Sequence, residues 1–326
     1  MILFFFAYAL FFRRSMNKRI FVLFLIFWRY METSHRVVFE KPNLPELTLH
    51  HTVADMHFHS RHSDGLNRVS SIVRRARKLG IGLAITDHNA IRGAVRLATY
   101  ADILTIPGIE LTSREGAHLL VYFYNIETLI QFYESDVRPF LGKNVMTSLS
   151  LDMHGLIRRA RQYKSLILFP HPHCAIYTGI CNPMIAKDAQ ERLLGMADGV
   201  EVINAGNMKK WNLQCAVLGF NLGKCMTGGS DGHNLFQMGK AVTYADCPPN
   251  RTDFLDSVKN GTNRVIGKEM AFLQKVTSNG FKIKSSIRNS PHVMGKNVRF
   301  SYSIIHSRSR KVRDMVQRKI FRHAGS

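Results

Sequence analysis

Histidine, aspartate and glutamate recur in short motifs along the middle of this chain. The sequence has 15 histidines among 326 residues. Imidazole and carboxylate groups together are typical ligands of divalent zinc, manganese and iron. A dense group of them would be costly without a cation to neutralise the carboxylates, so the motifs predict a metal centre. The candidate ligands are His57, His59, Asp64, His88, Glu110, His118, His171, Asp231 and His233.

The motifs differ in how specifically they indicate metal. His57 and His59 stand two residues apart at the end of an expected strand, which would place both rings on one face. Asp64 follows them on a glycine-containing turn over the same face. Glu110 ends another strand, and a carboxylate is almost never buried without a partner. His118 taken alone is better explained as a satisfied or exposed histidine. Only the ordered set makes a metal site the better interpretation.

The elements that must position these residues are short apolar strands. Most of the motifs end such a run, and His118 opens one. The predicted strands cover 52–54, 81–85, 103–106, 119–124, 166–169, 199–203 and 224–227. Stretches of helical periodicity lie between them, at 69–79, 90–100, 149–163 and 208–222. This alternation predicts a parallel α/β architecture. In a barrel of that kind the carboxyl ends of the strands converge on one face, so the candidate ligands should meet in space.

The composition supports a folded protein in a reducing compartment. Hydrophobic residues make up 45% and charged residues 21%, which excludes disorder throughout, collagen and coiled coil. The five cysteines are odd in number and form no Cys-x-x-Cys pair. A disulfide framework is therefore not expected, and the cytoplasm is the expected location.

The N-terminal 30 residues differ from the rest. They contain two apolar runs separated by four Lys or Arg residues, and each run is about half the ~20 residues of a membrane-spanning helix. Three interpretations stay open: translation that truly starts at Met16 or Met31, membrane association through residues 1–30, or a cleaved signal peptide. Residues 32–52, which contain two prolines, are expected to be a linker.

The C-terminal segment is strongly basic. The net charge of the chain is +22, and residues 275–326 hold 13 Lys or Arg and one Asp, a net charge of +12. Such a segment either binds polyanions or is a solvated extension with no specific partner. We therefore divide the chain into an N-terminal segment (1–51), a central barrel domain (52–274) and a basic extension (275–326).

The ordered motifs resemble those of the PHP (polymerase and histidinol phosphatase) superfamily over about residues 52–245. The matching strings are Asp55-Met56-His57-Phe58-His59-Ser60 with Ser63-Asp64-Gly65, Ile85-Thr86-Asp87-His88-Asn89, Pro107-Gly108-Ile109-Glu110 with His118, His171-Pro172, and Ser230-Asp231-Gly232-His233-Asn234. The resemblance implies a distorted seven-stranded β/α barrel, similar to a TIM barrel, with the metal site at the C-terminal strand ends. It also implies metal-dependent hydrolysis of phosphoesters.

The same resemblance implies two or three divalent ions, with manganese, zinc or iron as candidates. The implied ligand sets are His57, His59, Glu110 and Asp231 for the first ion, Asp64, His88 and His233 for the second, and Glu110, His118 and His171 for the third. Glu110 would bridge two ions. The position of Asp64 and the short spacing from Glu110 to His118 are most similar to the branch of nucleotide phosphatases and short-RNA exonucleases.

A metal cluster of this type can hydrolyse phosphoesters without a nucleophilic side chain. A water between two cations has its pKa lowered towards neutrality, and the resulting hydroxide can attack phosphorus. Asp87 and His173 are candidates for protonating the leaving oxygen. Glu201 and Asn204 end a strand on the same face and are expected to hydrogen-bond the ligands. The candidates for contacting substrate phosphates, unless they are simply solvated, are Arg61, His62 and Arg114.

The sequence predicts a metal-dependent phosphatase or phosphodiesterase acting on nucleotides or short nucleic acids. One alternative is a phosphatase for a small metabolite, such as a sugar phosphate or a compound like histidinol phosphate. Another is a non-catalytic module that binds nucleic acid, with the basic tail as its main feature.

Overall fold

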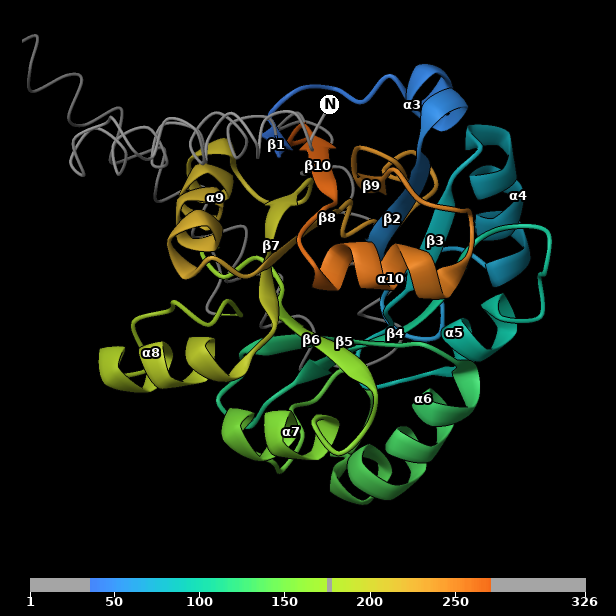
Figure 1. Cartoon of the computed structure of the whole chain (residues 1–326). Coiled ribbons are helices and arrows are strands. Elements are labelled where there is room, and N and C mark those ends of the chain that lie inside the picture. Colours follow the sequence, from blue (N-terminus) through green and yellow to red (C-terminus); the bar gives the residue numbers. More distant parts are fainter. Residues whose placement is uncertain (1–35, 175–177, 271–326) are drawn as a thin grey trace, which may run out of the picture.

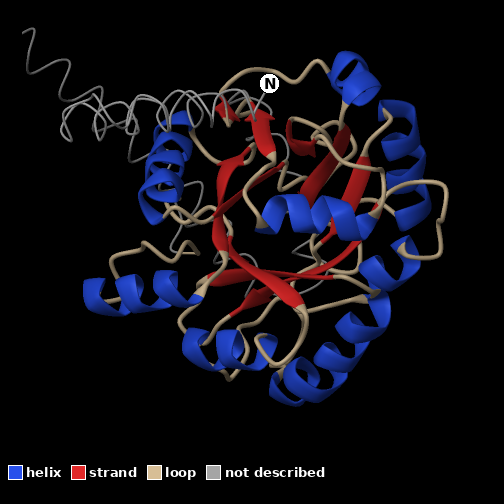
Figure 2. Cartoon of the chain, viewed as in Figure 1, coloured by secondary structure: helices blue, strands red, loops and turns tan. Residues whose placement is uncertain are grey.

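The computed structural model describes residues 36–174 and 178–270. The predictions for residues 1–30 and 275–326 lie outside these described residues. A curled sheet of ten strands forms the centre, and helices lie around its outside (Figures 1 and 2). The strands, in their order across the sheet, are β1 (Val37–Val38), β10 (Arg264–Gly267), β9 (Ala241–Ala245), β2 (Thr52–Phe58), β3 (Gly82–Ile85), β4 (Thr105–Thr112), β5 (His118–Phe123), β6 (Ser165–Phe169), β7 (Gly199–Asn204) and β8 (Cys225–Gly229).

The curl of the sheet brings β8 close to β2 and β9. Phe58 at the end of β2 forms an isolated bridge with Gly232, just beyond β8. The hydroxyl of Thr243 in β9 donates to the carbonyl of Gly228 in β8 at 3.0 Å. These contacts bring the loops after β2 and β8 together, although the two strands are far apart in the order of the sheet.

The α/β class and all seven predicted strands are confirmed, but the closed seven-stranded barrel is not. The sheet has ten strands of mixed direction and forms a curled half-barrel. β4 and β5 are antiparallel, with Thr112 opposite His118. The connection between them has five residues, too few for the crossover that a parallel pair needs. β5 also runs antiparallel to β6, and β9 runs antiparallel to both of its neighbours.

The segment expected to be a linker is folded in part. β1 pairs with β10 in parallel, with Val37 opposite Val265. Helix α3 (Leu44–His50) follows, and Leu44 is buried in the core. Proline is accepted in the first turn of a helix because the N–H groups there have no partner within the helix. Pro45 therefore fits the first turn of this helix, and residues 37–50 belong to the same folded unit as the sheet.

The remaining helices are mostly amphipathic elements on the outside of the sheet (Figure 2). They are α4 (Val69–Leu79), α5 (Arg92–Leu97), α6 (Ile126–Phe132), α7 (Met153–Ala160), α8 (Lys187–Met196), α9 (Lys209–Leu222) and α10 (Arg251–Lys259). A short π-helix, η1 (Tyr133–Val137), and a short 3₁₀-helix, η2 (Arg138–Phe140), follow α6. In α4 the buried residues Val69, Ile72, Val73 and Ala76 form one stripe, and the helix ends at Gly80 with a left-handed φ of 69°.

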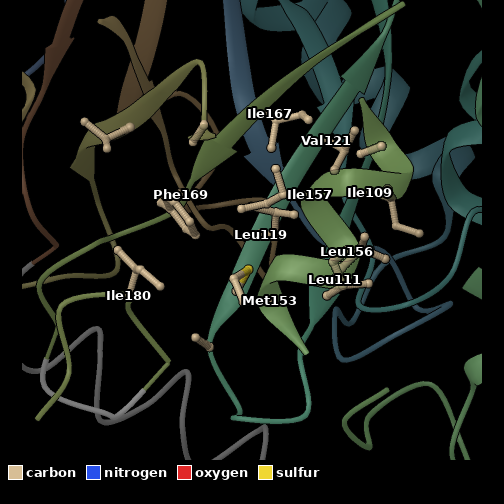
Figure 3. Close-up of a cluster of buried hydrophobic side chains, with 14 of the residues drawn as sticks. Ile109, Leu111, Leu119, Val121, Met153, Leu156, Ile157, Ile167, Phe169 and Ile180 are labelled. Atoms are coloured by element: carbon tan, nitrogen blue, oxygen red, sulfur yellow. The ribbon is translucent and has the colours of Figure 1, made fainter. Parts of the chain in front are cut away.

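The largest hydrophobic core lies between the sheet and α7. Figure 3 shows Met153, Leu156 and Ile157 of α7 close to side chains of β4, β5 and β6. Asp152 begins this helix by accepting a hydrogen bond from the N–H of Gly155 at 2.7 Å. This packing holds the strands that carry Glu110 and His118. No helix within the described residues is both long and apolar enough to cross a bilayer.

Candidate metal centre

The structure brings all nine predicted ligands together. His57, His59 and Glu110 lie on or directly after β2 and β4, and all three are buried. β5 runs in the opposite direction to β4, so its first residue, His118, faces the same site. The other five follow the ends of β2, β3, β6 and β8: Asp64, His88, His171, Asp231 and His233. The sequence predicts that the strand ends bring the candidate ligands together, and the structure confirms this arrangement.

The first group consists of His57, His59, Glu110 and Asp231. The Nε2 atoms of the two histidines are 3.2 Å apart, and each lies 3.3 Å from Oε2 of Glu110. Oδ1 of Asp231 lies 3.1 Å from Nε2 of His59 and 3.5 Å from Nε2 of His57. Ligands about 2.1 Å from a tetrahedral ion lie about 3.4 Å from one another. The spacing of these four side chains fits one cation.

The carboxylate of Glu110 faces histidines on two sides. Its Oε1 atom lies 2.8 Å from Nδ1 of His118 and 3.4 Å from Nε2 of His171. Its Oε2 atom lies 3.1 Å from Nδ1 of His88, as well as near the first group. This is the arrangement that a bridging carboxylate requires. His88 presents Nδ1 to Glu110 and Nε2 to Asp64, so it lies close to both groups, and the grouping with Asp64 and His233 that the resemblance implies agrees with the geometry.

A further group forms around Asp64. Its Oδ2 atom lies 2.9 Å from Nε2 of His233 and 3.8 Å from Nε2 of His88, and its Oδ1 atom lies 3.6 Å from Nδ1 of His59. His59 therefore presents one nitrogen to each of two groups. The turn that carries Asp64 requires a glycine, since a Cβ atom on Gly65 would lie 2.2 Å from the carbonyl oxygen of His59.

Buried carboxylates and amides hold the ligands from behind. Oε1 of Glu201 lies 3.0 Å from Nδ1 of His57, and its Oε2 accepts from the backbone N–H of His171 at 3.0 Å. The side-chain amide of Asn204 donates to Glu201 at 2.9 Å and to Asp231 at 3.3 Å. The supporting role predicted for Glu201 and Asn204 is confirmed by these contacts.

Asp55 has no role predicted from the sequence, although it is a lone carboxylate within an apolar strand. It is fully buried, and its oxygens accept the N–H groups of Ser230 and Gly239, each at 2.9 Å. Burial raises the pKa of Asp55 to about 6, although these hydrogen bonds oppose the shift. Asp55 thereby ties β2 to the loop that carries Asp231 and His233.

Backbone strain is concentrated at the site. Among the described residues, only Asn89, His171 and Asp231 are non-glycine residues with positive φ, at 47°, 32° and 48°. Two of them are candidate ligands, and the third follows His88. The Asn89 amide donates to the carbonyls of Val145 and Thr147, both at 2.9 Å, and so holds the loop before α7. Such outliers cluster at functional sites, where the surrounding structure holds them.

Burial and neighbouring charges shift the pKa values of residues in the site. Burial opposes a charge on His57, but Glu201, Glu110 and Asp231 outweigh it and raise the pKa well above its ordinary value. Burial would raise the pKa of Glu110, yet the surrounding histidines hold it well below the usual range. His88 behaves differently, because burial prevails and lowers its pKa well below the ordinary value. The carboxylates of the site therefore favour the protonated form of His57, whereas burial favours the neutral form of His88.

The donor set fits divalent cations better than it fits a hydrogen-bond network. Three imidazole nitrogens, from His57, His59 and His88, lie within 3.3 Å of the single atom Oε2 of Glu110. Within the described residues, the buried Nδ1 atom of His59 has no hydrogen-bond partner. Six imidazoles with three carboxylates suit zinc, manganese or iron.

The residues predicted for proton transfer lie in different environments. Asp87 is buried, and its carboxylate accepts from the N–H and hydroxyl of Ser60, both at 2.7 Å, and from the hydroxyl of Ser63 at 2.8 Å. His173 lines a groove with residues of α9, including Leu213 and Val217, and its hydrogen bonds among the described residues use its backbone N–H and carbonyl and not its ring. The catalytic roles of both stay predictions.

The residues predicted to contact phosphate lie at the rim. Arg61 is exposed on the loop after β2, and the half-buried His62 follows it. The N–H of His62 donates to the hydroxyl of Ser60 at 3.2 Å. Arg114 is exposed and lies 3.4 Å from Asp152, so part of its charge is already compensated. Their contacts with substrate stay predictions.

Comparison with known proteins agrees with this geometry. Residues 55–171 match the PHP domain family, and residues 211–263 match the PHP-associated family. The uncharacterized protein MJ1587 of Methanocaldococcus jannaschii is 28% identical over 168 residues, which cover 47% of this chain and 81% of that protein.

Solved structures are similar in fold. A two-domain protein from Bacteroides vulgatus that contains a predicted PHP-like metal-dependent phosphoesterase has a TM-score of 0.51 and 18% identity, covering 74% of this chain and 72% of its own. The lesion-specific endonuclease PfuEndoQ from Pyrococcus furiosus has a TM-score of 0.50 and 16% identity, covering 66% of this chain and 57% of its own. Residues 55–171 of this chain therefore carry a PHP domain, and the solved structures are similar to the chain in fold.

Proposed function

We propose that this protein is a metal-dependent phosphoesterase that hydrolyses phosphoester bonds of nucleotides or short nucleic acids. The observation that carries the proposal is the Glu110 carboxylate, whose two oxygens face different histidines. A carboxylate placed in this way can hold two cations close together. We assign the activity to residues 52–274, in keeping with the family match and with the position of every candidate ligand.

The residues of the chain divide the work as follows. His57, His59 and Asp231 would hold one cation together with Glu110, and Glu110 would share another with His118 and His171. Asp64, His88 and His233 would hold a further ion. Divalent cations supply Lewis-acid stabilisation of a phosphoryl group and a water of lowered pKa. Glu201 fixes the orientation of His57, and Asp55 fixes the loop of Asp231, so the ligands are preorganised.

Metal-dependent hydrolysis by the full-length protein tests the proposal. The protein is stripped with a chelator and then loaded with manganese, zinc or iron separately. Substrates are p-nitrophenyl phosphate, nucleoside bisphosphates, sugar phosphates, histidinol phosphate and short 5′-phosphorylated RNA. We expect turnover only after metal loading, with nucleotide substrates preferred. A preference for sugar phosphates or histidinol phosphate would favour the small-metabolite alternative.

Variants tie the activity to the cluster. His57→Ala and Glu110→Gln should each bind less metal and lose more than about 100-fold in rate, since loss of supporting residues alone costs about 10–100-fold. His154→Ala, an exposed histidine on α7, is the matched control and should behave as wild type. Metal binding without hydrolysis of any phosphoester would indicate a binding module instead.

A further inference from the structure

An exposed aromatic side chain lies on the loop that carries Asp231 and His233. Phe236 is 85% exposed, the highest value among the large apolar side chains that the structure describes, and it follows His233 by three residues. Its loop is tightly held. The side-chain oxygen of Gln237 accepts from the N–H groups of His233 and Asn234 at 2.5 and 3.0 Å, and the side-chain oxygen of Asn234 accepts from the N–H of Phe236 at 3.1 Å.

This loop is joined to the loop that follows β2. The N–H of Leu66 donates to the carbonyl of His233 at 2.8 Å, and Leu66 is itself 39% exposed. An ordered loop thus displays Phe236 beside the ligands instead of burying it. Exposing a phenylalanine forgoes the free energy that its burial would contribute, so a ring held at a site of this kind suggests a ligand with a flat apolar face.

Basic side chains lie on α5, which is close to the loop that follows β2. Gly93 lets the first turn of α5 approach closely, since a Cβ atom there would lie 2.1 Å from Oδ2 of Asp87 and 2.8 Å from the hydroxyl of Ser60. Arg92 therefore begins its helix directly beside the loop that carries Arg61. Arg96 lies one helical turn further along the same face.

These arginines lack the carboxylates that other arginines have. Arg61, Arg92 and Arg96 are exposed, and none forms an ion pair within residues 36–174 and 178–270. Arg77, by contrast, is held by Asp102 at 2.6 Å. Like charges on one helix face destabilise it slightly, and an anionic ligand would offset that cost.

His62 follows Arg61 on the loop after β2 and is half-buried. Nε2 of His62 is buried and has no hydrogen-bond partner among the described residues. The three arginines give the ligand loop a positive face on the α5 side.

We propose that this rim binds a single strand of nucleic acid: the base of the nucleotide at the cluster stacks on Phe236, and phosphates next to it contact Arg61, Arg92 and Arg96. The inference rests on the proposed function only for the position of the reacting phosphate. Stacking on an exposed ring tolerates any base, and arginine suits phosphate contacts, so the rim would accept strands of varied sequence.

Binding of a fluorescent short oligothymidylate with phosphorothioate linkages to the full-length protein tests the ring. Phe236→Ala should weaken binding about 5–150-fold, in line with the loss of one base stack. Phe236→Trp should retain it. Leu49→Ala, which truncates another apolar side chain (77% exposed, on α3), is the control and should change nothing. An abasic strand of equal length should bind wild type and Phe236→Ala alike.

The salt dependence of the same binding tests the arginines. The double variant Arg92→Gln and Arg96→Gln should lower the slope of log affinity against log salt by about 0.7 for each phosphate that is no longer neutralised. Arg158→Gln, an exposed arginine on α7, should leave the slope unchanged. The two arginine substitutions should weaken abasic and normal strands equally.

The outcomes separate this inference from the proposed function. Equal binding by Phe236→Ala and Leu49→Ala would overturn the stacking role, even if p-nitrophenyl phosphate is hydrolysed. An unchanged salt slope in the double arginine variant would overturn the phosphate contacts. If the variants weaken strand binding as expected but no metal-dependent hydrolysis is found, the rim stands and the proposed function fails.

Discussion

Glu201 lies directly behind His57, with Oε1 3.0 Å from Nδ1 of the imidazole, and both side chains are buried. A carboxylate at this place favours a proton on Nδ1, which leaves the lone pair of Nε2 facing Glu110 and Asp231. The pair therefore fixes both the tautomer and the orientation of the ring. The two residues are 144 positions apart in the chain, so only the fold brings them together.

Glu201→Gln should weaken metal binding and turnover by about 10–100-fold while the fold persists. The amide keeps the shape of the side chain but cannot accept hydrogen bonds at both ends. Calorimetric titration with manganese and the melting curve of the metal-free protein measure the two effects. Glu191→Gln on the exposed face of α8 is the matched control. Unchanged metal affinity would show that the carboxylate is dispensable.

The metal-free protein should be most stable in mildly acidic solution. Burial opposes the charged form of His57 and His59, but neighbouring carboxylates raise both pKa values above 6.5. Their stabilisation is complete below pH 6.5 and is lost as the pH rises through the folded values. Burial likewise opposes the charge of Glu110, but histidines lower its pKa below 4.5, so its contribution is lost as the pH falls below that value.

We therefore expect the melting temperature in chelator to be highest between about pH 4.5 and 6.5 and to fall above this range. Metal binding displaces the protons from the histidines, so manganese should reverse the trend and stabilise the protein more at higher pH. Melting curves at several pH values, with and without manganese, check both statements. A metal-free protein that gains stability steadily from pH 6 to 8 would contradict the first one.

Asp87→Asn distinguishes a proton donor from a residue that holds a loop. The Asp87 carboxylate accepts three hydrogen bonds from Ser60 and Ser63. If it only holds the loop, the variant should bind less metal and lose the same factor on p-nitrophenyl phosphate and on an alkyl phosphate. If it protonates the leaving oxygen, the loss should be much larger for the alkyl phosphate, whose leaving group needs a proton. We expect the first pattern, and rates on both substrates with metal titrations decide.

Gly93→Ala should destabilise the protein by about 1–3 kcal/mol, because the new methyl group would overlap Asp87 and Ser60. The displacement should also lower metal affinity through the loop of Asp64. Gly195→Ala on α8 is the matched control, since nothing lies within 4 Å of its Cβ position. There alanine should stabilise the helix by about 0.5–1 kcal/mol. Urea denaturation measures both, and equal effects would refute the close approach of α5.

Removal of residues 275–326 should weaken binding to RNA or DNA without slowing hydrolysis of a small phosphoester. The segment carries a net charge of +12, and contacts to phosphates make affinity fall steeply with salt. Binding curves over a range of salt concentrations should flatten after deletion. If the full-length protein binds no polyanion at low salt, the segment is a plain extension.

The ligands were predictable because each one interrupts or ends an apolar run, and strands that end together bring such residues together. His173 shows where this reasoning fails. Alternation along an extended chain would place it on the same side as His171, but His171 has a φ of 32°, so the chain turns and His173 lies against α9. A local turn of this kind leaves no mark in the spacing of residues.

Long-range pairing explains the other differences. The strand at Val37–Val38 has two residues and exists only because β10, more than 220 positions later, offers an edge. Nothing in the sequence marks Phe236 as exposed, because one phenylalanine next to Leu235 and near Met238 has no periodicity that would place it on a surface. The role proposed for Phe236 depends on the exposure of its side chain. That exposure results from the loop conformation, which the side chains of Asn234 and Gln237 hold.

The pairing of β1 with β10 also makes the described fold almost circular. The carbonyl of Arg36 accepts a hydrogen bond from the N–H of Val265 at 2.7 Å, so the polypeptide enters and leaves the sheet at adjacent strands, about 4.8 Å apart. A short peptide joining residue 270 to residue 36 would close the ring, and new ends could then be opened in a surface loop that contacts none of the candidate ligands. Strand order would be preserved in such a circular permutant, and so would the convergence of strand ends that assembles the cluster.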